Sequence, residues 1–582
     1  MTQSNYDKHP HVAVAGMEDQ CWTGWQSILK CLSGQLNAVG GKILTIECYV
    51  GVSVEEIVAA VRSQLPAATV FVTSKAWLEH DEIERRVKPF LGNGDPLFGY
   101  VSALRMEDYF SPEKLAAMQR AIAAVARGPV VVIGPGASIV HRGDVIVYAE
   151  MPRWEAQGRM RRNEMSNLGV ENRELKWSLK YKRAWFNDWP VCDRLKLALR
   201  DVDFILDTCK PAEPKMISRE AARRAYETAL SRPFRVVPFF DPAPWGGQWM
   251  KRTMALPEDV PNYGWCFDCV PEENSIVFRF GDTLVELPAM NLVFFDPNRL
   301  LGSRVHARFG MSFPIRFDLL DTVEGGNLSL QVHPFTDFIQ RHFGVPYTQD
   351  ESYYLLAAEE GSVIYLGLEE GADPGEMIAA LEAAQAGDKA FDDERFVCRW
   401  PAKVHDHYLI PAGTCHCSGK GTVVLEISAT PNIFTFKLWD WGRVGLDGLP
   451  RPINIERGKR NIAWERTRSW VERELVNVVS EVASGEGWRE ERTGLHALEF
   501  IETRRHWFSG SVSHDTGGGV NVLNLVEGRE AVVESPGGAF EPFVVHYAET
   551  FIVPACVGPY TIRPHGEAAG TTCATLKASV RT

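Results

Sequence analysis

The first 215 residues alternate between two hydrophobic patterns. Short apolar runs, typical of buried strands, are separated by stretches in which apolar residues recur every three or four positions, as on one face of a helix. The strand-like runs are 42–48, 129–134 and 144–149, and the helical stretches are 54–64 and 112–126. Ser53 and Ser111 precede the helical stretches and are suitable N-cap residues. Because strands that alternate with helices form βαβ units, we expect an α/β domain at residues 1–215 with a mostly parallel sheet.

The pattern changes after a Pro-containing segment at 208–215, which we interpret as a linker. Short strand-like runs dominate from 233 to 470, and one of them is a hairpin at 272–287 with a Gly-Asp turn. A single helical stretch, 374–385, interrupts these strands. Short strands and Gly-rich turns then recur from 490 to 582. The sequence therefore predicts two all-β domains of jelly-roll type, the first of them with a helical insertion.

A row of polar side chains interrupts the apolar pattern of the first β domain. In Asn-Leu-Ser-Leu-Gln-Val-His-Pro (327–334), three apolar residues alternate with Ser329, Gln331 and His333. Side chains alternate between the two faces of a strand, so the three polar residues share one face at intervals of about 7 Å. Such a row is compatible with a solvated strand face and also with a binding site.

Two later residues favour the binding site. Glu351 opens a second strand-like run, and His416 lies in a Gly-bounded turn before the strand 422–427. Together with Gln331 and His333 they offer two imidazoles, a carboxylate and an amide oxygen. This donor set suits zinc or another divalent first-row metal with coordination positions left open.

The motifs in this region resemble those of class I (zinc-dependent, cupin-type) mannose-6-phosphate isomerases. In chain order they are Pro-Trp-Gly-Gly (244–247), Leu-Ser-Leu-Gln-Val-His-Pro (328–334), the Glu351 strand, Gly-Thr-Cys-His-Cys-Ser-Gly-Lys-Gly-Thr (413–422) and Leu-Trp-Asp-Trp-Gly-Arg (438–443). The resemblance covers residues 233 to 580. It implies cupin barrels, the metal ligands Gln331, His333, Glu351 and His416, and the isomerisation of mannose-6-phosphate to fructose-6-phosphate through an enediol.

The same resemblance implies roles for several other residues. Arg443 corresponds to an arginine that steadies the enediolate charge, although a salt bridge at a strand end is an alternative role for it. Ser329 matches a serine that contacts the phosphate, and Arg451 is a further candidate for phosphate binding. Gln349 stands where the family usually has lysine, and Asp241-Pro-Ala-Pro precedes Trp245 in place of another family lysine. Loss of these cations predicts weaker phosphate recognition.

The second β domain lacks a corresponding ligand set. His514, His546 and His565 do not have ligand spacing with a carboxylate, and no second Gln-x-His motif follows. We therefore expect this barrel, residues 490–582, to be free of metal.

The N-terminal domain weakly resembles P-loop nucleoside kinases. Its first strand, loop and helix occupy the positions of a phosphate-binding loop, and the Arg-rich segment 150–162 is similar to the lid of those kinases. The loop Glu-Cys-Tyr-Val-Gly-Val-Ser (47–53), however, contains no Gly-Lys-Ser/Thr. Without that lysine and the run of glycine amides the loop cannot cradle a triphosphate, so we expect a degenerate domain that does not hydrolyse ATP.

Composition and charge argue against several classes of binding partner. The net charge of −13 argues against a general nucleic-acid or anionic-membrane binder. No apolar run reaches the roughly 20 residues needed to span a bilayer, and the first residues contain no apolar core of a secretory signal. The 12 cysteines are scattered through the chain, as expected for free thiols in a reducing compartment. We expect a cytosolic protein that binds a sugar or sugar phosphate, and the pattern leaves its oligomeric state open.

Three functional hypotheses follow from the sequence. The first is a metal-dependent aldose–ketose isomerase, favoured by the joint presence of the four ligands and Arg443. The second is a non-catalytic sugar or sugar-phosphate sensor that combines a degenerate kinase-like domain with two cupin barrels. The third is a metal-cupin enzyme of another reaction type. Gln349 and the altered phosphate loop favour the second and third hypotheses.

Overall fold

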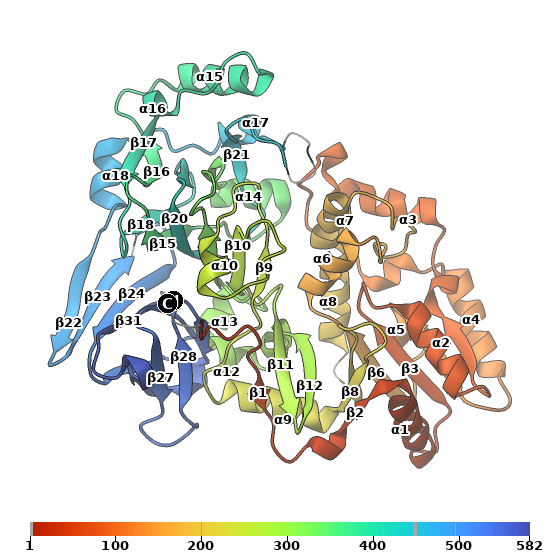
Figure 1. The fold of residues 1–582 in the computed structure, drawn as a ribbon. Coiled ribbons are helices and arrows are strands. Elements are labelled where there is room, and N and C mark those ends of the chain that lie inside the picture. Colours follow the sequence, from red (N-terminus) through yellow and green to blue (C-terminus); the bar gives the residue numbers. More distant parts are fainter. Residues whose placement is uncertain (1–3, 200, 446–447, 449–450, 495, 582) are drawn as a thin grey trace. The chain divides into compact units, whose positions relative to one another are not determined.

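The computed structural model describes residues 4–199, 201–445, 448, 451–494 and 496–581, and these cluster into two compact units (Figure 1). The α/β unit comprises His11–Thr228 and Ser275–Phe294. The barrel unit comprises the described residues up to Pro10, Ala229–Asn274 and the described residues from Phe295 onward. The α/β unit therefore takes in residues on both sides of 233, and we describe each unit by itself.

The α/β unit is built on a seven-stranded sheet with the strand order β2-β8-β7-β6-β3-β5-β4. Strands β3 to β7 run parallel, as predicted, while β8 and β2 are antiparallel additions at one edge. The bounds are β2 (Cys21–Thr23), β3 (Ile43–Cys48), β4 (Thr69–Val72), β5 (Val130–Gly134), β6 (Val145–Glu150), β7 (Phe204–Asp207) and β8 (Lys215–Ser218). The sheet thus continues beyond residue 215, where the sequence pattern placed a linker.

The helices of this unit begin where their capping residues predict. The Ser53 side chain accepts a hydrogen bond from the Glu56 amide, and the Ser111 side chain accepts one from the Lys114 amide. Each bond satisfies an amide that has no partner within its own helix. The main helices are α1 (Gly24–Ala38), α2 (Val54–Gln64), α3 (His80–Val87), α4 (Pro112–Ala124), α6 (Arg153–Arg161), α7 (Trp177–Arg183), α8 (Trp189–Ala198) and α9 (Arg219–Leu230).

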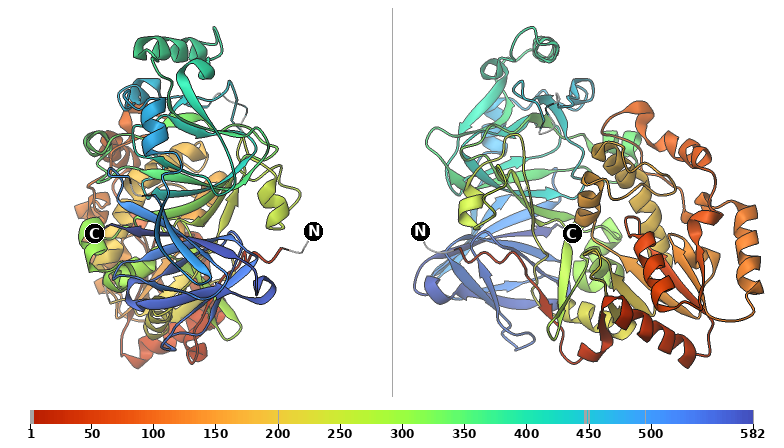
Figure 2. Two further views of the ribbon diagram at one scale, coloured as in Figure 1. Left: turned by 90° about the vertical axis from the view of Figure 1, so that its left-hand side faces the viewer. Right: turned by 45° about the vertical axis from the view of Figure 1, so that its right-hand side comes forward.

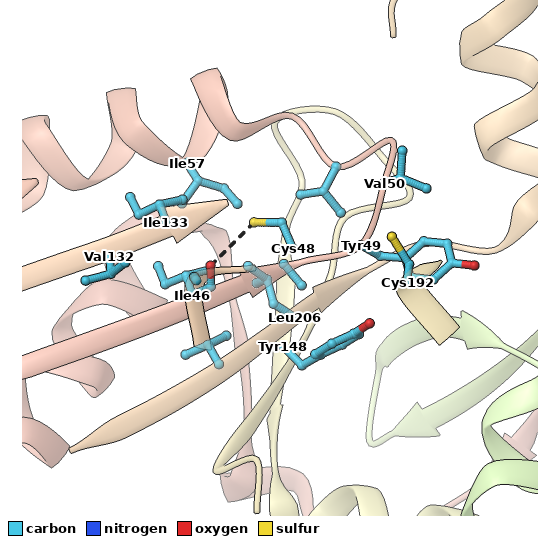
Figure 3. Close-up of a cluster of buried hydrophobic side chains, with 14 of the residues drawn as sticks. Ile46, Cys48, Tyr49, Val50, Ile57, Val132, Ile133, Tyr148, Cys192 and Leu206 are labelled. Atoms are coloured by element: carbon cyan, nitrogen blue, oxygen red, sulfur yellow. Dashed lines mark hydrogen bonds between the residues drawn. The ribbon is translucent and has the colours of Figure 1, made fainter. Parts of the chain in front are cut away.

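The carboxyl end of β3 lies at the switch point of this sheet, where α/β proteins commonly bind ligands. Here buried side chains fill it, among them Tyr49, Val50 and Cys192 (Figure 3). The Tyr49 and Val52 amides donate to carbonyls of the chain, and the Gly51 carbonyl accepts from the Arg159 guanidinium at 3.0 Å. These three backbone groups of the loop therefore form hydrogen bonds with other groups of the protein. That it hydrolyses no ATP stays a prediction.

A hairpin inserted between barrel strands completes the α/β unit. It consists of β11 (Ser275–Phe280) and β12 (Thr283–Pro288), with the predicted Gly-Asp turn, and β11 pairs in parallel with β1 (Val12–Ala13). Asn291, in the following helix α11 (Met290–Phe295), donates to Glu150 at 2.7 Å. Lys196 donates to both Glu150 and Asn291. The hairpin segment thus closes a polar network around a carboxylate that is only 1% exposed.

The barrel unit contains two β-barrels, each made of two antiparallel sheets. In the first barrel one sheet has the order β18-β15-β20-β13-β10-β9 and the other has the order β17-β16-β19-β14-β21. Its strands are β9 (Phe239–Asp241), β10 (Trp265–Cys269), β13 (Ile315–Asp321), β14 (Leu330–Val332), β15 (Glu351–Ala358), β16 (Val363–Leu368), β17 (Val397–Pro401), β18 (His407–Ile410), β19 (His416–Ser418), β20 (Thr422–Ala429) and β21 (Phe436–Trp439).

The second barrel pairs a six-stranded sheet, β22-β23-β24-β31-β26-β29, with a four-stranded sheet, β25-β30-β27-β28. Its strands are β22 (Ser480–Gly485), β23 (Trp488–Gly494), β24 (Ile501–Phe508), β25 (Val512–Asp515), β26 (Asn521–Glu527), β27 (Glu530–Glu534), β28 (Phe543–His546), β29 (Thr550–Val553), β30 (Pro559–Pro564) and β31 (Cys573–Val580). The interior holds a compact apolar cluster that includes Phe508, Leu525 and Phe551.

The predicted helical insertion is present as α15 (Pro374–Ala386), capped by Asp373, between β16 and β17 of the first barrel. It lies on the side of the first barrel away from the second barrel (Figures 1 and 2). No helix among the described residues is both long enough and apolar enough to cross a membrane.

A buried histidine couples the stability of the barrel unit to pH. His407 begins β18 and is fully buried, with its ring against Tyr354. Burial, reinforced by the Arg505 charge, lowers the pKa of His407 to about 3. In the unfolded chain the pKa of histidine is about 6.5. Between about pH 6.5 and pH 3 the unfolded state therefore binds a proton that the folded state does not bind. Stability is therefore complete above pH 6.5 and falls with decreasing pH, by about 1.4 kcal/mol per pH unit, until about pH 3.

We expect the melting temperature of the protein to fall more between pH 7.5 and pH 5.0 than that of the His407→Gln variant. The exposed His80 provides the control, since His80→Gln should leave the difference between the two pH values unchanged. Thermal unfolding followed by circular dichroism measures both. Equal decreases in the protein and in His407→Gln would contradict the assignment.

Candidate metal centre

The predicted ligands come from three strands of the first barrel. Gln331, in the middle of β14, is directly opposite His416 at the start of β19. His333 follows β14 by one residue, and Glu351 begins β15 in the other sheet. The apolar residues of β14 are buried in the core, so the predicted alternation of faces is confirmed.

His333, Glu351 and His416 form a compact buried triad. The Nε2 atom of His333 lies 3.2 Å from one carboxylate oxygen of Glu351, and Nε2 of His416 lies 2.7 Å from the other. One ligand atom from each residue lies within 4.8 Å of the other two. All three side chains are at most 2% exposed. Among the described residues this is the only such cluster of three.

Backbone carbonyls fix the orientation of both imidazoles. Nδ1 of His333 donates to the Phe434 carbonyl at 3.1 Å, and Nδ1 of His416 donates to the Thr414 carbonyl at 2.8 Å. Each ring therefore carries a proton on Nδ1 and turns Nε2 to the centre of the triad, where Nε2 faces the Glu351 carboxylate. Metal-binding histidines are commonly held in this way.

Charge compensation within the triad shifts two pKa values. Burial alone would raise the pKa of Glu351, but the imidazoles of His333 and His416 lower it far below its usual range. Burial opposes protonation of His333, yet the Glu351 carboxylate outweighs this effect and raises the pKa of His333. The triad thus keeps its carboxylate ionised and supplies two nitrogens and one carboxylate, a set that fits zinc or a similar divalent ion.

Two glutamines border the triad. The Gln331 amide nitrogen lies 3.2 Å from Nε2 of His416, so the amide reaches the centre of the site. The Gln349 amide donates to Glu351 at 3.1 Å and to Glu426 at 3.3 Å. Gln349 therefore orients the Glu351 carboxylate of the triad, whereas the sequence analysis expected it to face a phosphate.

A second group of predicted residues gathers around Asp440. The Ser329 hydroxyl donates to Asp440 at 2.8 Å, the Arg443 guanidinium donates to it at 2.7 Å, and Arg451 donates to both of its oxygens at 3.1 and 2.9 Å. Arg451 also reaches the Ser329 hydroxyl at 3.2 Å. Ser329 is two residues before Gln331, so this group begins about 7 Å along the strand from the ligands. The salt bridge that was the alternative role of Arg443 is present.

Sequence reasoning missed two charged residues beside these groups. Lys437, on β21, is opposite Gln331, and burial together with the Arg451 charge lowers the pKa of Lys437 to about 7. Glu426, on β20, is opposite both Tyr353 and Asp318, and burial with the Asp318 charge raises its pKa. The available signal was a charged residue within an otherwise apolar strand, in Phe-Lys-Leu-Trp and in Val-Leu-Glu-Ile.

We expect His333→Ala to lose its metal. Removing one imidazole from the triad should weaken zinc binding by about 100-fold or more, because even residues that only orient a ligand contribute 10- to 100-fold. The zinc content of dialysed protein, measured by mass spectrometry, and competition with a chelator report the loss. His342→Ala, the same change at an exposed position of α14 (Thr336–Phe343), should leave zinc binding intact. A stoichiometric zinc content with unchanged affinity in His333→Ala would refute the ligand assignment.

Comparison with known proteins finds one family model and several curated and solved relatives. Residues 24–231 match a family model described as a domain of unknown function, DUF8485. That description names no function, so the resemblance of this part to P-loop kinases stays a prediction.

The chain is also similar, over part of its length, to mannose-6-phosphate isomerases. It is 25% identical over 215 residues to the enzyme of Streptococcus mutans, spanning 37% of this chain and 62% of that relative. It is 23% identical over 231 residues to the isomerase ManA of Bacillus subtilis, spanning 39% of this chain and 67% of that relative.

Among solved structures, the mannose 6-phosphate isomerase of Bacillus subtilis aligns with a TM-score of 0.48 and 18% identity over 60% of this chain and 99% of that chain. A variant phosphomannose isomerase of Salmonella typhimurium aligns at 0.45 and 16% over 60% and 100%. Similarity to curated isomerases therefore extends over about two fifths of the chain.

Proposed function

We propose that the protein is a metal-dependent aldose–ketose isomerase that acts on mannose-6-phosphate or a closely related sugar phosphate. The observation that carries the proposal is the buried triad of His333, Glu351 and His416, with Gln331 at its edge. The sequence similarity to mannose-6-phosphate isomerases supports the same conclusion.

Isomerisation moves a proton between C1 and C2 of the open-chain sugar and creates negative charge on oxygen. A bound zinc ion would supply Lewis-acid stabilisation of that charge. Proton transfer is assigned to Glu426, because this carboxyl group is buried in the barrel, Gln349 links it to Glu351 of the triad, and burial raises its pKa. Gln349 bridges Glu426 and Glu351 and so positions the proton carrier relative to the metal ligand.

Three cations on the opposite side of Gln331 support a phosphorylated substrate. Lys437, Arg443 and Arg451 surround a single carboxylate, Asp440, and both arginines are paired with it. With all three bases protonated, the group carries a net charge of about +2, which matches a phosphate dianion. Lys437, on the neighbouring strand β21, therefore supplies the additional cation that the resemblance led us to expect from a lysine at position 349.

The test is an assay of zinc-loaded protein with mannose-6-phosphate, with fructose-6-phosphate measured as the product. We expect turnover that His333→Ala abolishes by losing the metal. In Glu426→Gln turnover should fall by about 100- to 10,000-fold, the usual contribution of a proton-transfer group, while zinc content is retained.

Glu382→Gln, an isosteric change at an exposed position of α15, is the matched control and should be fully active. A zinc-loaded protein that binds the sugar phosphate without converting it would favour the sensor hypothesis. Full activity in Glu426→Gln would remove Glu426 from the mechanism and leave the metal assignment intact.

The phosphate assignment generates a separate prediction for Arg451. Arg451→Gln removes a guanidinium that reaches both Asp440 and Ser329, so we expect KM for mannose-6-phosphate to rise by about 10- to 100-fold, the value of a hydrogen bond to a charged group. Weak turnover of unphosphorylated mannose, if present, should not change. Arg473→Gln, at an exposed arginine of α18 (Arg468–Glu474), controls for loss of charge. An unchanged KM in Arg451→Gln would show that the phosphate binds elsewhere.

A further inference from the structure

The interior of the second barrel contains a pair of buried histidines. His506 lies on β24 and His514 on the next strand, β25, which belongs to the other sheet of the barrel. Their ring centroids are 4.4 Å apart, and the side chains are 2% and 6% exposed. The sequence analysis considered His514 beside His546 and His565, found no ligand spacing with a carboxylate, and expected this barrel to be free of metal.

Neighbouring side chains hold both rings in place. Nε2 of His506 lies 3.3 Å from a Glu490 carboxylate oxygen, so this nitrogen carries the proton and Nδ1 presents a lone pair. The ring of His514 stacks on Tyr560 with an angle of 10° between the planes. A carboxylate that accepts from the outer nitrogen of an imidazole is the usual support of a metal-binding histidine.

The remaining polar atoms of the pair lack partners within the described protein. Nδ1 of His506 and both ring nitrogens of His514 are buried and form no hydrogen bond, and the same holds for the hydroxyl of Thr575, which is opposite His506. Leaving buried polar groups unpaired is unfavourable, and a bound ion would satisfy them. Lone pairs on two adjacent, fixed imidazoles are the donors that zinc, copper and nickel prefer.

We propose that His506 and His514 bind a divalent first-row transition metal inside the second barrel, at a site separate from the triad of the first barrel. The ring centroids are 4.4 Å apart, so the two imidazoles are close enough for one ion to contact both at a Zn–N distance of about 2.0 Å. The site offers fewer protein ligands than the triad, so it binds metal more weakly and completes its coordination with water.

The charges around the pair permit a cation. Glu490 and Glu502 both accept from Arg504, at 2.9 and 2.5 Å, and Lys577 is opposite Arg504 on β31. Two carboxylates thus balance two bases, and the surroundings add no net positive charge.

The test is zinc titration of the metal-stripped full-length protein by calorimetry, with bound zinc counted by mass spectrometry after gel filtration. We expect two equivalents in the unaltered protein and one weaker equivalent in His333→Ala. Adding His514→Gln to His333→Ala should remove the remaining equivalent, whereas His333→Ala with His565→Gln should keep it. Cobalt in place of zinc should give His333→Ala a visible spectrum that His514→Gln removes.

His506→Gln is the second variant at the pair, and circular dichroism establishes that each variant is folded. A single equivalent in the unaltered protein, or none in His333→Ala, would overturn the proposal. So would zinc that survives both His514→Gln and His506→Gln, which would then be held by other groups such as cysteine thiols. The readout is metal binding, so the result does not depend on isomerase activity.

Discussion

The ionised Glu351 carboxylate, buried at the junction of two sheets, is the constraint on which the first barrel depends. A carboxylate without compensation in such a place would be very costly, and most proteins avoid it by protonation. Here the imidazoles of His333 and His416 compensate it, and each is oriented by a backbone carbonyl. This arrangement requires β14, β15 and β19 to keep one register, because a shift of one residue would turn the ligands to the opposite face. The triad therefore forms only when the strands of the barrel keep this register.

The local alternation of residues was enough to predict the ligand face of β14, the α/β character of the first part and the caps at Ser53 and Ser111. It was not enough for contacts that depend on which strands are neighbours. Lys437 and Glu426 are adjacent to the site only because β21 pairs with β14 and β20 pairs with β15, and nothing in a single sequence states those pairings. The contact of Gln349 with Glu426 depends on the fold in the same way, since the two residues are 77 positions apart in the chain.

The two barrels use buried histidines in different electrostatic settings. In the first barrel a carboxylate lies between the two imidazoles and holds a full charge in the interior. In the second barrel the carboxylate, Glu490, bonds to one ring from its outer side, and the space between the rings contains no acidic group from the described residues. Spacing along the chain could not separate these cases, because His506 and His514 reach one another across two sheets.

The hairpin 275–294 has a consequence for how the chain can be divided. The polypeptide leaves the α/β unit after residue 228, builds the first strands of the barrel unit, returns to the α/β unit with this hairpin and then leaves it again. A gene fragment that ends at residue 231, the limit of the matched family model, would encode the seven-stranded sheet without Asn291. Glu150 and Lys196 would then lose a shared buried partner, and β1 would lose the strand with which it pairs. The segments of the two units thus alternate along the sequence. A single crossover between their coding sequences therefore cannot exchange either unit for another domain.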